Sequence, residues 1–159
     1  MSHDPPAPDR LIAQNRRASH DYFILETLEA GLVLSGTEVK SLRQGKASLA
    51  EAYATVENGE GWVIQMHIPP YEQGNRWNLD PVRRRKLLLH VSQIAMLEKA
   101  VAQKGQTIVP LKLYFSGGFA KLLLGVAKGK KEHDKRHAIA ERDARREMDR
   151  ARRGGGRDS

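Results

Sequence analysis

The chain has 159 residues, no cysteine and a net charge of +8, so it has room for one compact domain but not for a disulfide framework or a cysteine-based zinc site. No segment approaches the ~20 apolar residues of a membrane span, and the polar N-terminus lacks the apolar run of a signal peptide, so we expect a soluble, cytoplasmic protein with no membrane contact. Residues 128–159 hold 12 Lys and Arg against 7 Asp and Glu. Positive charge gathered in one segment favours a nucleic-acid partner over a merely soluble basic protein.

The distribution of apolar residues divides the chain into three parts. Residues 1–10 are polar and rich in proline, and residues 11–127 contain the apolar segments from which a core can form. Residues 128–159 are basic and have few apolar side chains. We therefore expect a flexible N-terminus, one folded domain and a basic C-terminal tail.

The first elements of the folded part are short. Residues 22–29 and 32–36 are rich in strand-forming residues, and Ala30-Gly31 separates them, which predicts two strands joined by a tight turn. Thr37 is suited to cap a helix that ends at Gly45. One or two helical turns are predicted there.

Two hairpins follow later in the chain. Residues 52–56 and 62–68 flank Asn58-Gly59, which is among the strongest short hairpin signals. Residues 107–115 and 119–127 flank a Ser-Gly-Gly turn and predict a second hairpin.

A long loop and one helix lie between these hairpins. Residues 69–81 are rich in Pro, Gly, Asn and Gln, and a loop of that length in a small domain is more often functional than idle. Ser92 can cap a helix that closes at Gly105. The apolar face of this helix is predicted to contain Ile94, Leu97 and Val101.

About six short antiparallel strands, one packed helix and one short helix predict a mainly β fold. Pro110 has no amide proton, so its part of the strand should lie at an edge or a β-bulge. The small core favours a closed or partly closed barrel with the packed helix across one end. The OB-fold is the best-known barrel of this size that binds nucleic acid.

Two basic groups in the folded part could contact RNA. Residues 15–22 (NRRASHDY) offer phosphate donors and an aromatic ring before the first strand, and residues 83–86 are four consecutive cations. Either group could instead be an ordinary solvated surface. The sequence leaves both alternatives open.

The basic tail has the pattern of a helix with few apolar contacts. Acidic residues precede basic ones by four positions at Glu132/Arg136, Glu141/Arg145 and Asp149/Arg153, and each such pair stabilises an isolated helix by about 0.2–0.5 kcal/mol. That is too little to order a lone helix of this length. We expect the tail to be disordered when free and helical when bound.

No pattern of catalytic residues is present. The chain lacks a nucleophile elbow, a P-loop and a dinucleotide fingerprint. His133 and His137 have a spacing compatible with a metal, but no third ligand is near and a solvated pair is the better interpretation. We expect no enzyme activity, metal or cofactor.

Several blocks of sequence occur in a characteristic order. They are residues 15–24 (NRRASHDYFI), 29–32 (EAGL), 36–43 (GTEVKSLR), 80–89 (DPVRRRKLLL), 125–131 (GVAKGKK) and 133–136 (HDKR). In this order they resemble the small protein B family, the SsrA-binding (tmRNA-binding) proteins of bacteria. The resemblance runs from about residue 11 to residue 153.

The resemblance implies an OB-fold barrel that binds the tRNA-like domain of tmRNA and brings it, aminoacylated with alanine, to ribosomes stalled on messages without a stop codon. The implied process is trans-translation, in which the ribosome switches template and adds a degradation tag. The implied partners are tmRNA, the 70S ribosome and its small-subunit rRNA, with alanyl-tRNA synthetase and elongation factor Tu reached indirectly through tmRNA. The competing interpretation is a structural rRNA-binding protein or translation factor built on the same barrel.

The resemblance also implies three groups of site residues. By motif position, those for tmRNA are Asn15, Glu29 and Leu88, with Arg17, His20, Lys40 and Arg43 as weaker candidates. Those for the decoding region are Lys128, Gly129, Lys130, Lys131, His133, Asp134, Lys135 and Arg136. Those on the helix that enters the empty mRNA channel include Arg142, Arg145 and Met148.

One departure from the family pattern lies near the end of the tail. Family members often carry apolar residues after the Asp-basic-Ala-basic pattern, whereas here residues 149–152 are followed by Arg153 and then by three glycines. Met148 is expected to supply the apolar contact instead. The glycines are expected to end the helix near Arg153.

Overall fold

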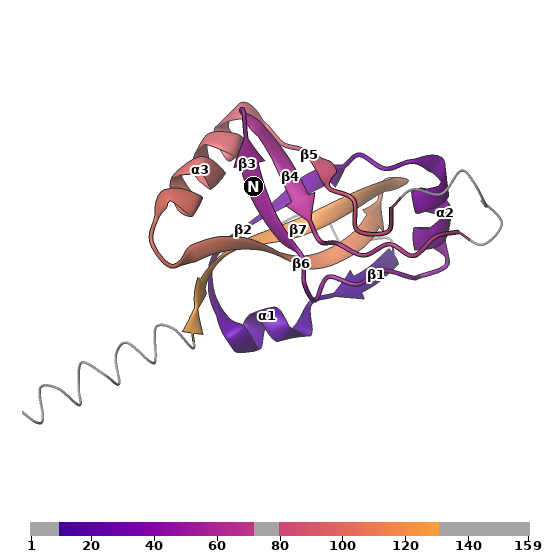
Figure 1. Ribbon diagram of the computed structural model, residues 1–159, viewed down its shortest axis with the longest axis horizontal. Coiled ribbons are helices and arrows are strands. Elements are labelled where there is room, and N and C mark those ends of the chain that lie inside the picture. Colours follow the sequence, from indigo (N-terminus) through magenta and orange to yellow (C-terminus); the bar gives the residue numbers. More distant parts are fainter. Residues whose placement is uncertain (1–9, 72–79, 131–159) are drawn as a thin grey trace, which may run out of the picture.

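The computed structural model describes residues 10–71 and 80–130 (Figure 1). In this part of the chain the strands are β1 (Arg10–Gln14), β2 (Tyr22–Leu32), β3 (Tyr53–Glu57), β4 (Glu60–Ile64), β5 (Arg85–Leu88), β6 (Gln106–Ser116) and β7 (Phe119–Gly129). The helices are α1 (Arg16–Asp21), α2 (Gly36–Arg43) and α3 (Val91–Ala102). None of these three helices is long and apolar enough to cross a membrane.

Six of the strands close into a barrel. They are hydrogen-bonded in the order β6-β3-β4-β5-β2-β7, and β7 pairs with β6 again, so the sheet returns to its first strand. The pairings are antiparallel, and β1 adds a seventh strand beside β6. Figure 1 places α2 and α3 at opposite ends of the barrel, with α1 near the end of β7. The predicted mainly β, OB-like barrel is confirmed, and β1 is a strand that the sequence did not predict.

The predicted turn at Ala30-Gly31 is wrong, because β2 runs through it without a break. Gly31 pairs with Leu88 of β5 on one side and Lys121 of β7 on the other. A Cβ atom on Gly31 would lie 3.1 Å from the Leu88 Cβ. Gly31 therefore lets the Leu88 side chain pack closely against the backbone of β2, which lies between β5 and β7.

Both predicted hairpins are confirmed, as β3–β4 and β6–β7. Asn58 and Gly59 have φ angles of 52° and 74°, the left-handed conformation that a two-residue hairpin loop requires. The pairing of β6 with β7 shifts register between Pro110 and Lys112. The expected bulge at Pro110 is therefore present, although β6 lies inside the sheet.

The helices begin earlier than the sequence suggested. Ser35, not Thr37, caps α2, because its hydroxyl accepts from the Glu38 amide while Glu38 accepts from the Ser35 amide. His90, not Ser92, precedes α3. Leu97 is fully buried as predicted, but Val101 is exposed. The helix packs instead through Leu97 with Met96 and Ala100.

The run of four cations at residues 83–86, which leads into β5, holds the fold together through acidic partners. Arg85 is fully buried, and its Nε donates to Glu38 at 2.7 Å, while its other nitrogens donate to the backbone carbonyls of Met66 and Pro81. Arg83 Nε donates to the same carboxylate at 3.1 Å. The two remaining cations of the run pair with exposed glutamates, Arg84 with Glu57 and Lys86 with Glu60. The run is therefore neither a free phosphate-binding patch nor a plain solvated face.

The buried carboxylate of Glu38 stays ionised because of its donors. Burial alone would raise its pKa, but hydrogen bonds from Arg83, the Ser35 amide and Arg85 together hold the pKa below its usual range. Removal of one partner from such a group leaves a buried charge uncompensated, which costs about 3–5 kcal/mol.

We expect Glu38→Gln to lower the free energy of unfolding by about 3–5 kcal/mol at neutral pH, measured by urea denaturation. Glu57→Gln is the matched control, because its exposed pair with Arg84 contributes at most about 1 kcal/mol. Since the folded pKa of Glu38 lies below the unfolded value, its contribution is present above about pH 4.3 and is lost as the pH falls further. The difference in unfolding free energy between wild type and Glu38→Gln should therefore narrow as the pH falls below about 4.3. Equal losses of stability for Glu38→Gln and Glu57→Gln would contradict the structural role of Glu38.

Candidate nucleic-acid interface

The long pairing of β2 with β7 separates the expected site residues into two groups. Tyr22 pairs with Gly129 at one end of this ladder and Gly31 pairs with Lys121 at the other. At about 3.3 Å per residue, the two ends lie about 30 Å apart. We call the end with Gly31 the Leu88 surface, which consists of Glu29, Gly31, Leu88, Phe119 and Lys121. We call the other end, where the basic C-terminal tail begins, the arm root, which consists of Arg16–Phe23 and Lys128–Lys130.

The Leu88 surface combines exposed apolar groups with few charges. The Leu88 side chain is 56% exposed although it stands on a barrel strand, and it lies against Gly31. Phe119, 71% exposed, follows the β6–β7 turn, and side chains two positions apart on a strand share a face, which places it with Lys121. This surface offers area for apolar or stacking contact beside a single cation.

Glu29 is held at this surface by Tyr114, whose hydroxyl donates to the Glu29 carboxylate. Burial, and then this hydrogen bond, raise the pKa of Tyr114 above its usual range, so the phenol remains a donor. The carboxylate is thereby fixed in position while remaining partly accessible.

Lys40 and Arg43 belong to the same end of the barrel as the Leu88 surface. Both lie on α2, which follows the C-terminal end of β2. The Arg43 guanidinium stands 5.0 Å from the centre of the Phe115 ring, and Phe115 pairs with Ala120, next to Lys121. Lys40 Nζ lies 5.7 Å from the centre of the Tyr71 ring. Lys40 and Arg43 are both exposed on the surface of the protein.

Asn15 is tied into the fold by its side chain. Its Oδ1 accepts from the Ala18 amide and caps α1, while its Nδ2 donates to the Pro110 carbonyl at 3.1 Å and the Leu49 carbonyl at 3.4 Å. Both the acceptor and the donor group of the side-chain amide therefore have hydrogen-bond partners within the protein. Asn15 thereby fixes the position of α1 against the barrel.

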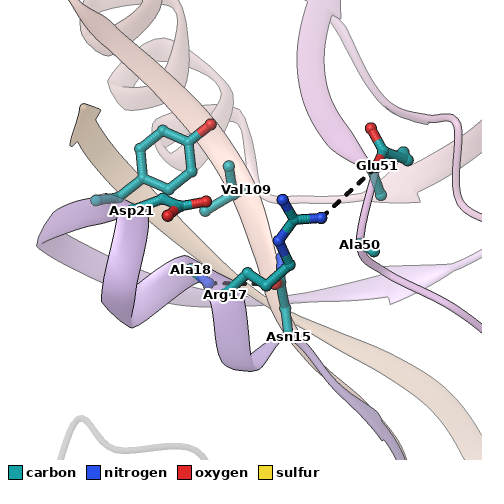
Figure 2. A pocket seen from close by; sticks show the side chains of 9 residues that line it. Asn15, Arg17, Ala18, Asp21, Ala50, Glu51 and Val109 are labelled. Carbon is teal, nitrogen blue, oxygen red and sulfur yellow. Dashed lines mark hydrogen bonds and ion pairs between the residues drawn. The ribbon is translucent and has the colours of Figure 1, made fainter. Parts of the chain in front are cut away.

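A small polar pocket adjoins α1. Its volume is about 180 Å³ and its lining includes Asn15, Arg17, Asp21 and Glu51. Figure 2 shows Arg17 extended toward Glu51, and its Nη1 lies 3.9 Å from the Glu51 Oε1. Both side chains are largely exposed, so this pair is weak.

His20 lies at the arm root and not at the Leu88 surface. Its ring is mostly exposed and its Nδ1 is 2.8 Å from the Asp21 carboxylate. The adjacent Ser19 contacts Lys130 through its carbonyl. The structure thus brings His20 near the end of β7, where Lys128, Gly129 and Lys130 lie.

The rest of the predicted tail site lies outside the described residues, as does the expectation of a helix that forms on binding. These positions are Lys131, His133, Asp134, Lys135, Arg136, Arg142, Arg145 and Met148.

Known proteins similar to this chain point to one family. The family model described as "SmpB protein" matches residues 12–154. This chain belongs to the SmpB family.

Among curated proteins, an SsrA-binding protein of Acetivibrio thermocellus is 61% identical over 141 residues, which cover 89% of this chain and 92% of that protein. An SsrA-binding protein of Bacillus cereus is 57% identical over 147 residues, covering 92% and 95% of the two chains. A solved structure described as "tmRNA-SmpB: a journey to the center of the bacterial ribosome" is 54% identical, with a TM-score of 0.65 over 78% of this chain and 85% of that one.

Sequence reasoning missed three residues of the interface region. Gly31 was interpreted as a turn, Tyr114 as an ordinary strand residue, and Phe119 only as the start of a strand. A signal existed for Phe119, because it directly follows the Gly117-Gly118 turn and such connections run over the protein surface. The partnership of Tyr114 with Glu29 joins residues 85 positions apart and has no local signal.

Two substitutions of Asn15 separate the contribution of its Oδ1, which caps α1, from that of its Nδ2, which donates to two backbone carbonyls. Asn and Asp are about equally good N-caps, so Asn15→Asp would be neutral if only the cap mattered. Because Nδ2 donates to two carbonyls, we expect Asn15→Asp to lose at least as much unfolding free energy as Asn15→Ala, which should lose about 1–3 kcal/mol. Urea denaturation of both variants tests this, and a wild-type stability for Asn15→Asp would show that the two donor contacts contribute nothing.

Proposed function

We propose that this protein binds the tRNA-like domain of tmRNA and acts with it on stalled ribosomes in trans-translation. The observation that carries the proposal is the match to SsrA-binding proteins over nine-tenths of the chain. The similarity to a chain described with tmRNA in the bacterial ribosome supports the ribosomal setting. We place the protein in the cytoplasm, where ribosomes work.

In this proposal the two ends of the β2–β7 ladder bind different partners. The Leu88 surface, with Lys40 and Arg43 nearby, holds tmRNA, since its exposed apolar groups suit unstacked bases and ribose edges. The arm root, with the tail beyond it, faces the decoding region. His20 and Arg17 lie with the arm root, so we assign them to the ribosomal side although their sequence motif first grouped them with tmRNA.

A binding role without chemistry fits these surfaces. The perturbed ionisable groups of the described residues, Glu38, Arg85 and Tyr114, are each engaged in structural contacts. Peptide transfer on a stalled ribosome belongs to the ribosome. The protein supplies position and recognition.

Substitution of Gly31 tests the Leu88 surface without removal of a charge. An added Cβ would lie 3.1 Å from the Leu88 Cβ and 3.3 Å from its Cδ1, so Gly31→Ala must displace the leucine by a few tenths of an ångström. We expect tmRNA affinity to fall about 3- to 10-fold, equivalent to about 0.7–1.4 kcal/mol. The dependence of affinity on salt should not change, because no phosphate contact is removed.

Gly36→Ala is the matched control, since a Cβ atom added to Gly36 would have no neighbour within 4 Å. Filter binding at several salt concentrations measures both variants, with thermal unfolding as a check on folding. If Gly31→Ala binds tmRNA as tightly as Gly36→Ala, the Leu88 surface is not the tmRNA site.

Removal of residues 132–159 tests the division between barrel and tail. We expect tmRNA affinity to be largely kept and the tagging of stalled nascent chains to be lost, as measured in a reconstituted translation system. The removed segment holds 9 of the 27 Lys and Arg residues of the chain, so a general RNA-binding role for it would reduce both readouts together. That outcome would favour the alternative of a structural rRNA-binding protein or translation factor.

A further inference from the structure

The last described residue of the chain is tied to helix α1. Lys130 follows β7, and its ammonium group donates to the backbone carbonyl of Ser19 at 3.0 Å. The same group lies 5.2 Å from the centre of the Phe23 ring, within the range of a cation–π contact. One side chain therefore joins the end of the last strand to the C-terminal turn of α1 and to the start of β2.

The Ser19 carbonyl is a suitable acceptor because α1 ends two residues later. The last carbonyls of a helix have no intrahelical partner and form the negative end of the helix dipole. The Tyr22 amide satisfies the carbonyl of Ala18, and Lys130 satisfies that of Ser19. A lysine beyond a helix C-terminus commonly fills this role.

Helix α1 is itself a firm support. Asn15 caps its N-terminus and ties it to the Pro110 carbonyl. Ala18, 1% exposed, packs with Val109 and Ala127 in a small core beneath the helix. A contact to the end of α1 is therefore a contact to the body of the barrel.

We propose that Lys130 is a positioning residue, which fixes the direction in which the chain leaves the barrel. The β2–β7 ladder ends at the pair of Tyr22 with Gly129, so it does not include Lys130. Lys130 extends the attachment by one residue through its side chain. The physical inference needs only the free protein, whereas its consequence for tagging rests on the proposed function.

That consequence follows from geometry. Residues 128–159 carry 12 cations, and in the proposed function they must meet rRNA while the Leu88 surface, about 30 Å away along β2, holds tmRNA. A fixed exit direction raises the effective concentration of the tail at its site. Without a fixed exit direction, tmRNA binding would stay intact, but the contact of the tail with rRNA would form more slowly.

Three variants of the free, full-length protein test the positioning role by ¹⁵N relaxation. Lys130→Met removes both contacts, Lys130→Arg keeps a cation that can donate and stack, and Lys128→Met removes an equal charge two residues earlier. We expect the order parameter of the residue-130 amide to be about 0.85 in wild type, Lys130→Arg and Lys128→Met, and below about 0.6 in Lys130→Met. An unchanged value in Lys130→Met overturns the proposal.

Tagging assays then test the consequence. Lys130→Met should lower tagging several-fold with tmRNA affinity within about twofold of wild type, and Lys130→Arg should restore tagging. Wild-type tagging by Lys130→Met would overturn the functional role of the contact. Failure of the wild-type protein to bind tmRNA would instead overturn the proposed function, and the relaxation result would still decide whether Lys130 fixes the exit direction.

Discussion

The antiparallel pairing of β2 with β7 is the constraint on which the rest of the structure depends. It runs from Tyr22 opposite Gly129 to Gly31 opposite Lys121 and helps to close the barrel. Because a strand is stiff along its axis, the same ladder sets the separation between the arm root and the Leu88 surface. In the proposed function this stiffness keeps the surface that binds tmRNA at a fixed distance from the surface that faces the ribosome, since both then move as one body.

A second constraint is the buried charge cluster of Glu38, Arg83 and Arg85. Arg85 donates to carbonyls on both sides of the long loop, at Met66 and Pro81, and so fixes the two ends of that loop to α2 through Glu38. Apolar residues of the same volume could fill this space and would often be as stable. They could not bind two backbone carbonyls, so the ions specify where the loop begins and ends.

Much of this fold could be predicted from local patterns, and the failures share a cause. The hairpin at Asn58-Gly59 and the bulge at Pro110 depend on backbone chemistry within a few residues, and both predictions are confirmed. Gly31 misled because a glycine needed for close packing of Leu88 looks the same in sequence as one needed for a turn. Arg83 and Arg85 looked like surface residues because Glu38, their shared buried partner, is 45 and 47 positions away in sequence.

The same reasoning explains why site residues are harder to assign than the family. Asn15, Arg17 and His20 are adjacent in sequence, and a motif groups them, but α1 gives them different tasks: Asn15 is satisfied within the fold, Arg17 borders a pocket, and His20 faces outward beside Lys130. Residues from one motif can thus have different roles in the structure. In the proposed function, the barrel end at which a residue lies, and whether its hydrogen-bonding groups are already used within the fold, therefore guide the assignment of its partner.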